Sequence, residues 1–382
     1  MERFDAIVVG AGPAGSTAAL RLARGDARVL LLDRARFPRD KPCGGGLTYR
    51  AVRELPVSVD PVVEDVVDRV ELSLSYRTRV ERGGQGPLVL MTQRHRLDAH
   101  LAEQAVAAGA EFRDGVRATA LELGEGQATI RFGGSAASAP VLIGADGVNG
   151  LTARTVGLGA RSHGVALEGN VPYAHTREER WRGRAAVDLG AVPGGYAWVF
   201  PKGDHVNVGV GGWESEGPRL REHLERACSA YGLPSGRVDD LRGYRLPMRR
   251  AGDPVQRGRV LLVGDAAALV DPLSGDGIYE AFVSARLASE AALEALQGGA
   301  ATLDAYGPRL DAALGRSLAA SWKAKYALER SPRVIYGIAR IPLVWGVIAA
   351  FLRGDLAHPG EARGIVRAPL RLVETIGSRT AA

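Results

Sequence analysis

The chain has 382 residues, of which 46% are apolar and 24% charged, so it suits two interlocked globular domains and excludes a disordered protein. Its 49 Lys and Arg residues outnumber its 43 Asp and Glu residues, for a formal net charge of +6. Cys43 and Cys228 are its two cysteines, so we expect neither a disulfide framework nor a metal site. The amino terminus lacks a signal-peptide layout, so the cytoplasm is the expected compartment.

The amino-terminal segment has the pattern of a β-strand–helix–β-strand unit. Phe4–Gly10 is a short apolar run that ends at glycine, and Val29–Leu32 is a second such run. Gly15–Arg24 lies between them and is predicted to be a helix.

Helix-like and strand-like segments then interleave. Helices are predicted at Leu97–Ala108, Leu220–Tyr231 and Ile278–Leu296, and buried strands at Val141–Ile143 and Val260–Val263. Alternating patterns typical of antiparallel strands occur at Val66–Val80, Leu88–Thr92, Arg184–Val192 and Tyr196–Gly212. We therefore expect an α/β fold with a discontinuous nucleotide-binding domain and an antiparallel sheet inserted in two places. The predicted boundaries are 1–65, 93–160 and 250–300 for the nucleotide domain, 66–92 and 161–249 for the sheet, and 301–382 for a helical carboxyl-terminal region.

The tail beyond Asp304 is predicted to be helical and includes Val334–Leu352. Its charge-free run, Ile341–Leu352, is shorter than the roughly 18 apolar residues that a membrane-spanning helix needs. This helix is either buried or leans on a membrane surface through Trp345 and Phe351. The late basic residues form either a solvated helix face or a surface for nucleic acid, an anionic membrane or a phosphorylated substrate. These basic residues are Lys323, Lys325, Arg330, Arg333, Arg340 and Arg353.

Three glycines follow the first predicted strand with the spacing Gly10-x-Gly12-x-x-Gly15. In this context Gly10 allows a tight turn, Gly12 lets the backbone approach a pyrophosphate, and Gly15 permits close packing of helix on strand. The phosphates would sit at the helix amino terminus, where free N–H groups favour anions. Asp33 closes the second strand and can accept hydrogen bonds from a ribose, and Arg34 beside it weakens the exclusion of a phosphorylated ribose. The motif predicts a dinucleotide and leaves NAD and FAD open.

Three later segments resemble the hydroxybenzoate-hydroxylase-like flavoproteins, and this resemblance implies FAD. Leu261–Ala267 with Asp271–Ile278 resembles their second FAD fingerprint, in which the aspartate, here Asp265, binds the ribityl or pyrophosphate region. The turn before Ile278 would present a helix amino terminus to the anionic edge of the reduced flavin. Gly144–Asn149 with Arg154 resembles the Asp-Gly motif, although Gly150 stands where Ser is usual. Arg94-x-x-Leu97-Asp98 resembles the arginine segment that contacts the cofactor's linker. The residues predicted to bind FAD are Gly10, Gly12, Pro13, Ala14, Gly15, Asp33, Arg34, Cys43, Gly44, Gly45, Arg94, Asp265, Pro272, Gly275, Gly277 and Ile278.

Two further segments resemble the geranylgeranyl reductases within this superfamily. Lys41–Leu47 is similar to their loop over the flavin, and Tyr196–Gly211 is similar to the hairpin that lines their lipid pocket. Side chains alternate along a strand, so Tyr196, Trp198 and Phe200 share one face. They form either an apolar wall for an isoprenoid chain or ordinary core aromatics.

The resemblance implies an enzyme that hydrogenates isolated C=C bonds of a prenyl chain, with hydride from reduced FAD and a proton from an acid. Cys43, Tyr49 or an ordered water are the candidate acids, and Cys43 could instead be a small buried residue. Cys228 is assigned to the core. The expected substrate is a prenylated small molecule or lipid, such as a geranylgeranyl compound or a menaquinone.

A second G-x-G-x-x-G motif is absent from the sequence, so the electrons would come from NADPH, ferredoxin or a quinol. We expect a monomer that binds no nucleic acid and contacts the inner face of the membrane peripherally. The alternatives are a flavin monooxygenase or halogenase, and a non-catalytic prenyl-lipid binder. Halogenases of this superfamily carry Trp-x-Trp-x-Ile-Pro, to which Tyr196-x-Trp198-x-Phe200-Pro201 is only partly similar.

Overall fold

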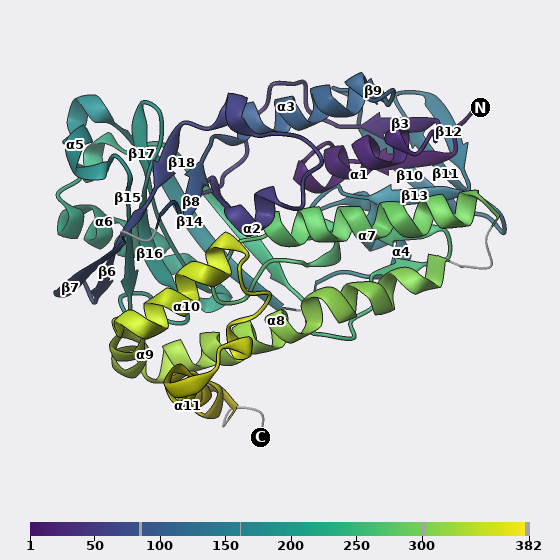
Figure 1. Cartoon of the computed structure of the whole chain (residues 1–382). Helices are drawn as coiled ribbons and strands as arrows, with labels where there is room; N and C mark the ends of the chain where they lie inside the picture. The colour runs from purple at the N-terminus through teal and green to yellow at the C-terminus, as the bar shows by residue number, and fades with distance from the viewer. Residues whose placement is uncertain (84–85, 161, 299–302, 379–382) are drawn as a thin grey trace.

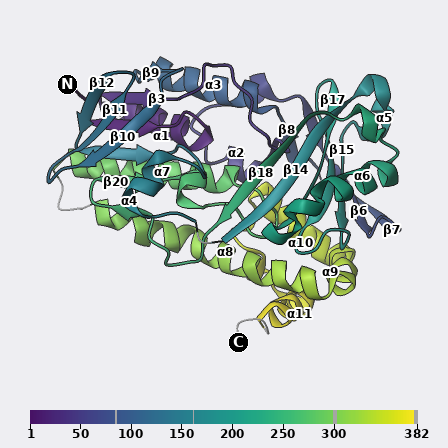
Figure 2. The same cartoon turned by 180° about the vertical axis from the view of Figure 1, so that it is seen from behind.

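The computed structural model describes residues 1–83, 86–160, 162–298 and 303–378. A nucleotide-binding lobe with a parallel sheet lies at one end of the molecule, and a large antiparallel sheet forms the other end (Figure 1). The carboxyl-terminal helices run alongside both, as the reverse view also shows (Figure 2). The predicted α/β class and the interleaving of the two lobes along the chain are confirmed.

The four central strands of the six-stranded sheet in the nucleotide lobe are the short apolar runs, and its two edge strands are mostly polar. Its order is β19 (Gln256–Arg257), β20 (Val260–Leu262), β13 (Val141–Gly144), β2 (Ala6–Val9), β3 (Val29–Leu32) and β9 (Glu111–Arg113). β2 pairs in parallel with β3 and β13. All residues of these three strands are buried, as expected for a parallel sheet covered on both faces. The helices of this lobe are α1 (Pro13–Arg24), α3 (Arg94–Ala107), α4 (Leu151–Val156) and α7 (Ile278–Leu296).

The antiparallel lobe is a seven-stranded sheet. Its order is β18 (Asp239–Met248), β14 (Ser162–Pro172), β17 (His205–Trp213), β16 (Tyr196–Pro201), β15 (Arg184–Leu189), β6 (Arg69–Leu74) and β7 (Thr78–Gly83). The predicted hairpin of β16 and β17 is confirmed. The long strands β14 and β18 were not predicted, because glycines and charged residues interrupt their alternation. The helices α5 (Glu178–Trp181) and α6 (Leu220–Tyr231) belong to this lobe, and Cys228 in α6 is buried as predicted.

Two smaller sheets were not predicted as separate sheets, because their strands are short and mixed in composition. One is β1 (Glu2–Arg3), β12 (Ser135–Ala139), β11 (Ala128–Phe132) and β10 (Ala118–Leu123), and it shares the core of the nucleotide lobe. The other is β4 (Gly46–Thr48), β8 (Val89–Met91) and β5 (Asp65–Val67), with the short helix α2 (Tyr49–Val52) directly after β4. The strand expected at Leu88–Thr92 is present, but it lies in this sheet and not in the large inserted sheet.

The tail is helical as predicted, in α8 (Tyr306–Arg330), α9 (Pro332–Ala339), α10 (Pro342–Arg353) and α11 (Arg367–Ser378). The helical stretch expected over Val334–Leu352 is divided at Pro342, which has no N–H to continue a helix and instead begins α10. In the described ranges no single helix is long and apolar enough to cross a membrane, and only α9 with α10, bent by 83°, meets that requirement as a pair.

Candidate functional site

A cavity of about 1170 Å³ lies where the two lobes and the carboxyl-terminal helices meet. It brings together nearly all of the predicted site residues, from segments spread over most of the chain. The lining includes the predicted cofactor-binding residues Gly10, Gly12, Pro13, Ala14, Asp33, Arg34, Cys43, Gly44, Gly45, Arg94, Asp265, Pro272, Gly275, Gly277 and Ile278. It also includes the predicted substrate-binding residues Tyr196, Trp198 and Phe200.

The three amino-terminal glycines each fit their predicted role. Gly10 has a φ of +103°, and a Cβ there would lie 2.3 Å from the carbonyl oxygen of Ala145. A Cβ on Gly15 would lie 1.7 Å from the carbonyl oxygen of Gly10, so only glycine lets α1 pack this closely. Gly15 is outside the cavity lining, so its contribution is to packing. Gly12 is the N-cap residue of α1 and faces the cavity without obstruction.

Two arginines face the amino terminus of α1. A Cβ built on Gly12 would lie 3.5 Å from Arg39 Nη2 and 3.8 Å from Arg94 Nη2. The buried Asp98 holds both guanidinium groups, with Arg94 Nη2 at 2.7 Å and Arg39 Nη1 at 2.8 Å from Oδ2. Two cations beside free helical N–H groups form an anion site of the kind that a pyrophosphate requires.

Asp33 is buried at the end of β3 and lines the same cavity. Its Oδ2 accepts the N–H of Ala11 at 2.8 Å, and its Oδ1 accepts the N–H of Ala35 at 2.9 Å. These bonds fix the carboxylate beside the glycine turn, where its remaining lone pairs can accept ribose hydroxyls.

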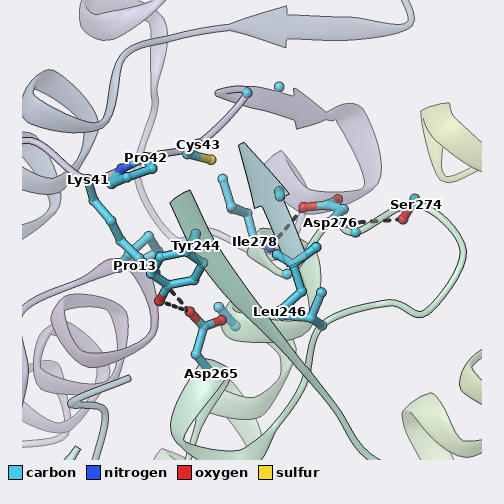
Figure 3. A pocket seen from close by; sticks show the side chains of 18 of the residues that line it. Pro13, Lys41, Pro42, Cys43, Tyr244, Leu246, Asp265, Ser274, Asp276 and Ile278 are labelled. Carbon is cyan, nitrogen blue, oxygen red and sulfur yellow. Dashed lines mark hydrogen bonds and ion pairs between the residues drawn. The ribbon is translucent and has the colours of Figure 1, made fainter. Parts of the chain in front are cut away.

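Asp265 follows β20, far along the chain from Asp33, and lines the same cavity. Its Oδ2 accepts one hydrogen bond from Lys41 Nζ and one from the hydroxyl of Tyr244, each at 2.8 Å (Figure 3). Burial alone would raise the pKa of Asp265, but Lys41 and Tyr244 hold it below its ordinary value. Asp265 is therefore an anion that ties the Lys41 loop and strand β18 to the second fingerprint.

The turn before α7 is shaped by two aspartates. Asp271 Oδ1 accepts the N–H groups of Leu273 and Ser274 at 3.0 and 2.8 Å. Asp276 Oδ1 accepts the N–H of Ile278, the first residue of α7, at 2.9 Å (Figure 3). The amino terminus of α7 thus opens on the cavity, where its dipole favours a negative charge.

The Asp-Gly segment departs from the flavoprotein motif at Gly150, and the structure explains the departure. Asp146 Oδ2 accepts the N–H of Thr152 in the first turn of α4 at 2.9 Å. A Cβ on Gly150 would lie 2.2 Å from Asp146 Oδ1. In this chain, glycine therefore leaves the room that this carboxylate needs to hold the start of α4.

The aromatic face of β16 lies as predicted. The ring centroids of Tyr196 and Trp198 are 5.7 Å apart, and those of Trp198 and Phe200 are 6.2 Å apart. The hydroxyl of Tyr196 donates to the carbonyl oxygen of Ser274, which links this face to the turn before α7. Trp198 Nε1 donates to Asn207 Oδ1 at 2.8 Å, so the buried indole has its polar atom satisfied.

Cys43 and Tyr49, the two candidate proton donors, occupy different places. Cys43 lines the cavity, and its Sγ accepts the N–H of Gly45 at 3.4 Å. Tyr49 begins α2 and is not part of the cavity lining, although it packs against the same apolar cluster as Cys43. Tyr49 is not brought to the site, because the neighbouring residue Arg50 lines the cavity from this short helix.

Several polar residues of the cavity were missed by sequence reasoning. Arg39, Arg50, Glu168, Arg242 and Tyr244 all line it. Lys202, which follows the aromatic face of β16, is buried and donates to the carbonyl oxygens of Gly44 and Thr92. None belongs to a local motif that would single it out. For Lys202, its period-two spacing after Phe200 was the available signal.

Three side chains of the tail decide between the alternatives that the sequence left open. Trp345 and Phe351 line the cavity, and Trp345 is only 6% exposed, so the buried alternative holds for them and not contact with a membrane surface. Lys325 is also buried, with Nζ 4.2 Å from the centre of the Trp213 ring, so it is no part of a solvated basic face. Trp345 and Phe351 belong to α10, the second helix of the bent pair, whereas Lys325 belongs to α8.

Comparison with known proteins places this cavity in a class. A family model described as an FAD binding domain matches residues 3–315. The chain is a flavin-dependent oxidoreductase that binds FAD, and the arginine-flanked glycine turn and the open amino termini of α1 and α7 fit that cofactor.

Two relatives and one solved structure narrow the class. The chain is 34% identical over 316 residues to the menaquinone reductase of Mycobacterium tuberculosis, covering 76% of each chain. It is 33% identical over 321 residues to digeranylgeranylglycerophospholipid reductase 1 of Methanopyrus kandleri, covering 77% of this chain and 81% of the relative. A geranylgeranyl bacteriochlorophyll reductase-like protein from Thermoplasma acidophilum has the same fold, with a TM-score of 0.81 at 23% identity over 98% of this chain and 100% of that one. This chain belongs to the geranylgeranyl reductase family of FAD-dependent oxidoreductases.

Proposed function

We propose that this protein saturates isolated C=C bonds in the prenyl chain of a lipid or quinone. The main support for this proposal is that the dinucleotide site continues into an apolar compartment within the same cavity. Strands of the antiparallel lobe and of the three-stranded sheet supply one wall, and the carboxyl-terminal helices supply the other. The apolar lining residues are Val67, Val70, Leu72, Val89, Met91, Ala185, Val187 and Leu189 from strands, and Leu328, Ile335, Ala339, Trp345, Ile348, Phe351 and Leu352 from helices.

This compartment matches the chemistry of an unactivated alkene. Reduced FAD, when bound, supplies the hydride. The protein must hold the apolar chain, exclude water and stabilise the positive charge that develops on carbon. Trp198, Phe200 and Tyr196 offer both apolar surface and negative ring faces, so they suit the last two tasks.

The substrate class follows from the relatives and from this compartment together. One relative is named for menaquinone and the other for a digeranylgeranyl phospholipid, and both molecules carry a polyprenyl chain with a polar head. We propose such a prenylated lipid or quinone as the substrate of this chain.

Delivery from a membrane is proposed for the tip between α9 and α10. Ile341 and Leu343 are 39% and 55% exposed there, and the exposed Arg340 precedes them. At the start of α9, Val334 is 39% exposed and follows the exposed Arg333. An apolar tip with flanking cations suits peripheral contact with an anionic bilayer, and this tip replaces the inward-facing Trp345 and Phe351 of the sequence-based expectation.

The reaction is tested by mass spectrometry of a menaquinone, and in parallel of geranylgeranyl diphosphate, incubated with dithionite-reduced protein. The expected result is a gain of two hydrogens per saturated double bond in either substrate, counted after any menaquinol has been reoxidised to menaquinone in air, because reduction of the quinone ring also adds two hydrogens. The oxidised protein serves as the control and should leave both unchanged. Insertion of oxygen under air would instead identify a monooxygenase, and tight binding without any mass change would identify a lipid carrier.

A further inference from the structure

The cavity contains a buried carboxyl group that belongs neither to the predicted cofactor-binding residues nor to the aromatic face of β16. Glu168 lies in the middle of β14, is 9% exposed and lines the cavity. Its Oε1 accepts the backbone N–H of Cys43 at 2.5 Å, so it is tied directly to the loop at the flavin site. A buried acid in a largely apolar cavity needs a structural or chemical reason to be there.

The register of the sheet places Glu168 next to the aromatic face. Gly209 of β17 is paired with Glu168 on one side and with Trp198 on the other. Directly paired residues of neighbouring strands share a face, so these three form a row across the sheet. A Cβ on Gly209 would lie 2.1 Å from Trp198 Cζ2. The indole of Trp198 therefore covers this glycine and extends across β17 toward Glu168.

The loop closes the other side of this row. A Cβ on Gly44 would lie 3.0 Å from the ring of Phe200 and 3.7 Å from Trp198 Nε1. The loop that receives the Glu168 carboxylate therefore rests on the same two rings. The carboxyl group, the two rings and Cys43 form one surface of the cavity.

We propose that Glu168 is the acid that protonates the substrate alkene. This assignment rests on the proposed prenyl reduction and supplies the proton donor for it. A chain lying against Trp198 and Phe200 would have the Glu168 carboxyl group beside it.

The charges around Glu168 favour a proton on it near neutral pH. Burial raises the pKa of Glu168 to about 7, against the opposing effects of the Cys43 N–H, Lys202 and Arg94, and Asp40 raises it further. Arg242, its partner on β18, donates to Asp40 at 2.9 Å. An acid that is half protonated near the working pH is well suited to general acid catalysis.

The electrons and the proton of this step balance. The π bond of the alkene breaks, one carbon gains the hydride pair from the reduced flavin, and the other gains the proton of the Glu168 O–H bond. The products are a saturated C–C bond, oxidised flavin and the Glu168 carboxylate. A proton from solvent restores the acid before the next turnover, and a reductant of the flavin, dithionite in the assay, restores the electron pair.

The test compares the wild type with Glu168→Gln and with a matched control. The amide of Glu168→Gln keeps an oxygen for the Cys43 N–H but has no acidic proton. Glu216→Gln is the control, because Glu216 is also buried but bonds Arg219 and His223 outside the cavity lining. Each protein is reduced with dithionite, freed of excess dithionite and mixed anaerobically with geranylgeranyl diphosphate, which has no quinone ring that could accept the electrons. Flavin reoxidation is then followed between pH 5.5 and 9. Infrared pH titration of each oxidised protein gives a readout that is independent of turnover.

We expect Glu168→Gln to slow substrate-dependent reoxidation by about 100-fold or more, the usual contribution of a general acid. The wild-type rate should fall as the pH rises through about 7, and the residual rate of Glu168→Gln should lack that fall. A carboxylic acid carbonyl band that titrates in the same range should be absent from Glu168→Gln. Glu216→Gln should retain the rate, the pH profile and the band.

Three results would overturn the assignment. One is a Glu168→Gln protein with the wild-type rate and pH profile, and another is a titrating band that survives in that variant. A third is a large loss in Cys43→Ser while Glu168→Gln stays active, which would move the acid to the thiol. A wild-type protein that leaves the alkene unreduced would instead overturn the proposed function, and this assignment with it.

Discussion

The glycine turn offers the sharpest test of how the cofactor is held, through the substitution Gly12→Ala. In the ligand-free protein the new methyl group would meet Arg39 Nη2 at 3.5 Å, an ordinary van der Waals contact. We therefore expect the stability of the apoprotein to change by no more than about 0.5 kcal/mol. The same methyl group projects into the cavity between Arg39 and Arg94, where the pyrophosphate is expected to approach the backbone.

The expected magnitude follows from crowding. An extra methyl group in a filled site costs about 1–3 kcal/mol. Since about 1.4 kcal/mol is a tenfold change in affinity, Gly12→Ala should weaken FAD binding by about 5- to 150-fold. The assay is fluorescence titration of apoprotein with FAD, paired with urea unfolding of the apoprotein.

Two companion variants separate the effects. Gly15→Ala would place its Cβ 1.7 Å from the carbonyl oxygen of Gly10, so it should lower both apoprotein stability and FAD affinity. Gly346→Ala, with no atom within 4 Å of its Cβ, should lower neither. If Gly12→Ala binds FAD as the wild type does, or destabilises the apoprotein as much as Gly15→Ala, the assignment of this turn to the pyrophosphate is refuted.

Three further predictions concern Tyr196 in the aromatic face of β16, the buried Lys202, and the tip between α9 and α10. Tyr196→Phe removes the hydrogen bond to the Ser274 carbonyl oxygen and should lower the free energy of unfolding by about 1 kcal/mol in urea denaturation. An unchanged free energy would show that this hydrogen bond does not stabilise the fold. Burial lowers the pKa of Lys202 from 10.5 to about 8, so between those values the unfolded chain binds more protons than the native one. The free energy of unfolding should therefore rise with pH across that window, and Lys202→Met should remove this part of the slope; equal slopes in both proteins would contradict the assignment. Leu343→Glu should reduce co-sedimentation with anionic vesicles by several-fold while leaving FAD binding intact, and equal sedimentation would exclude this tip as the contact.

Much of the nucleotide lobe could be predicted because its signals are local. The run from Phe4 to Leu32 carries a strand, a glycine turn and a helix whose conformations depend mainly on neighbouring residues. The hairpin of β16 and β17 was predicted for the same reason, since alternation and a turn specify it. The strands β14 and β18 escaped prediction, because their long antiparallel pairing with each other, and not the pattern of either strand alone, stabilises them.

The dinucleotide-binding turn and the common face of Tyr196, Trp198 and Phe200 could be read from local spacing, because the positions of residues along one element set both. By contrast, the contacts of Lys41 with Asp265 and of Glu168 with Cys43 join residues 224 and 125 positions apart, so they depend on how distant segments pack together. The tertiary structure also decided that Trp345 faces the cavity, because the 83° bend between α9 and α10 and the packing of α10 set the direction of that side chain. Local spacing fixes what one element presents, whereas the juxtaposition of distant side chains depends on how all the elements pack.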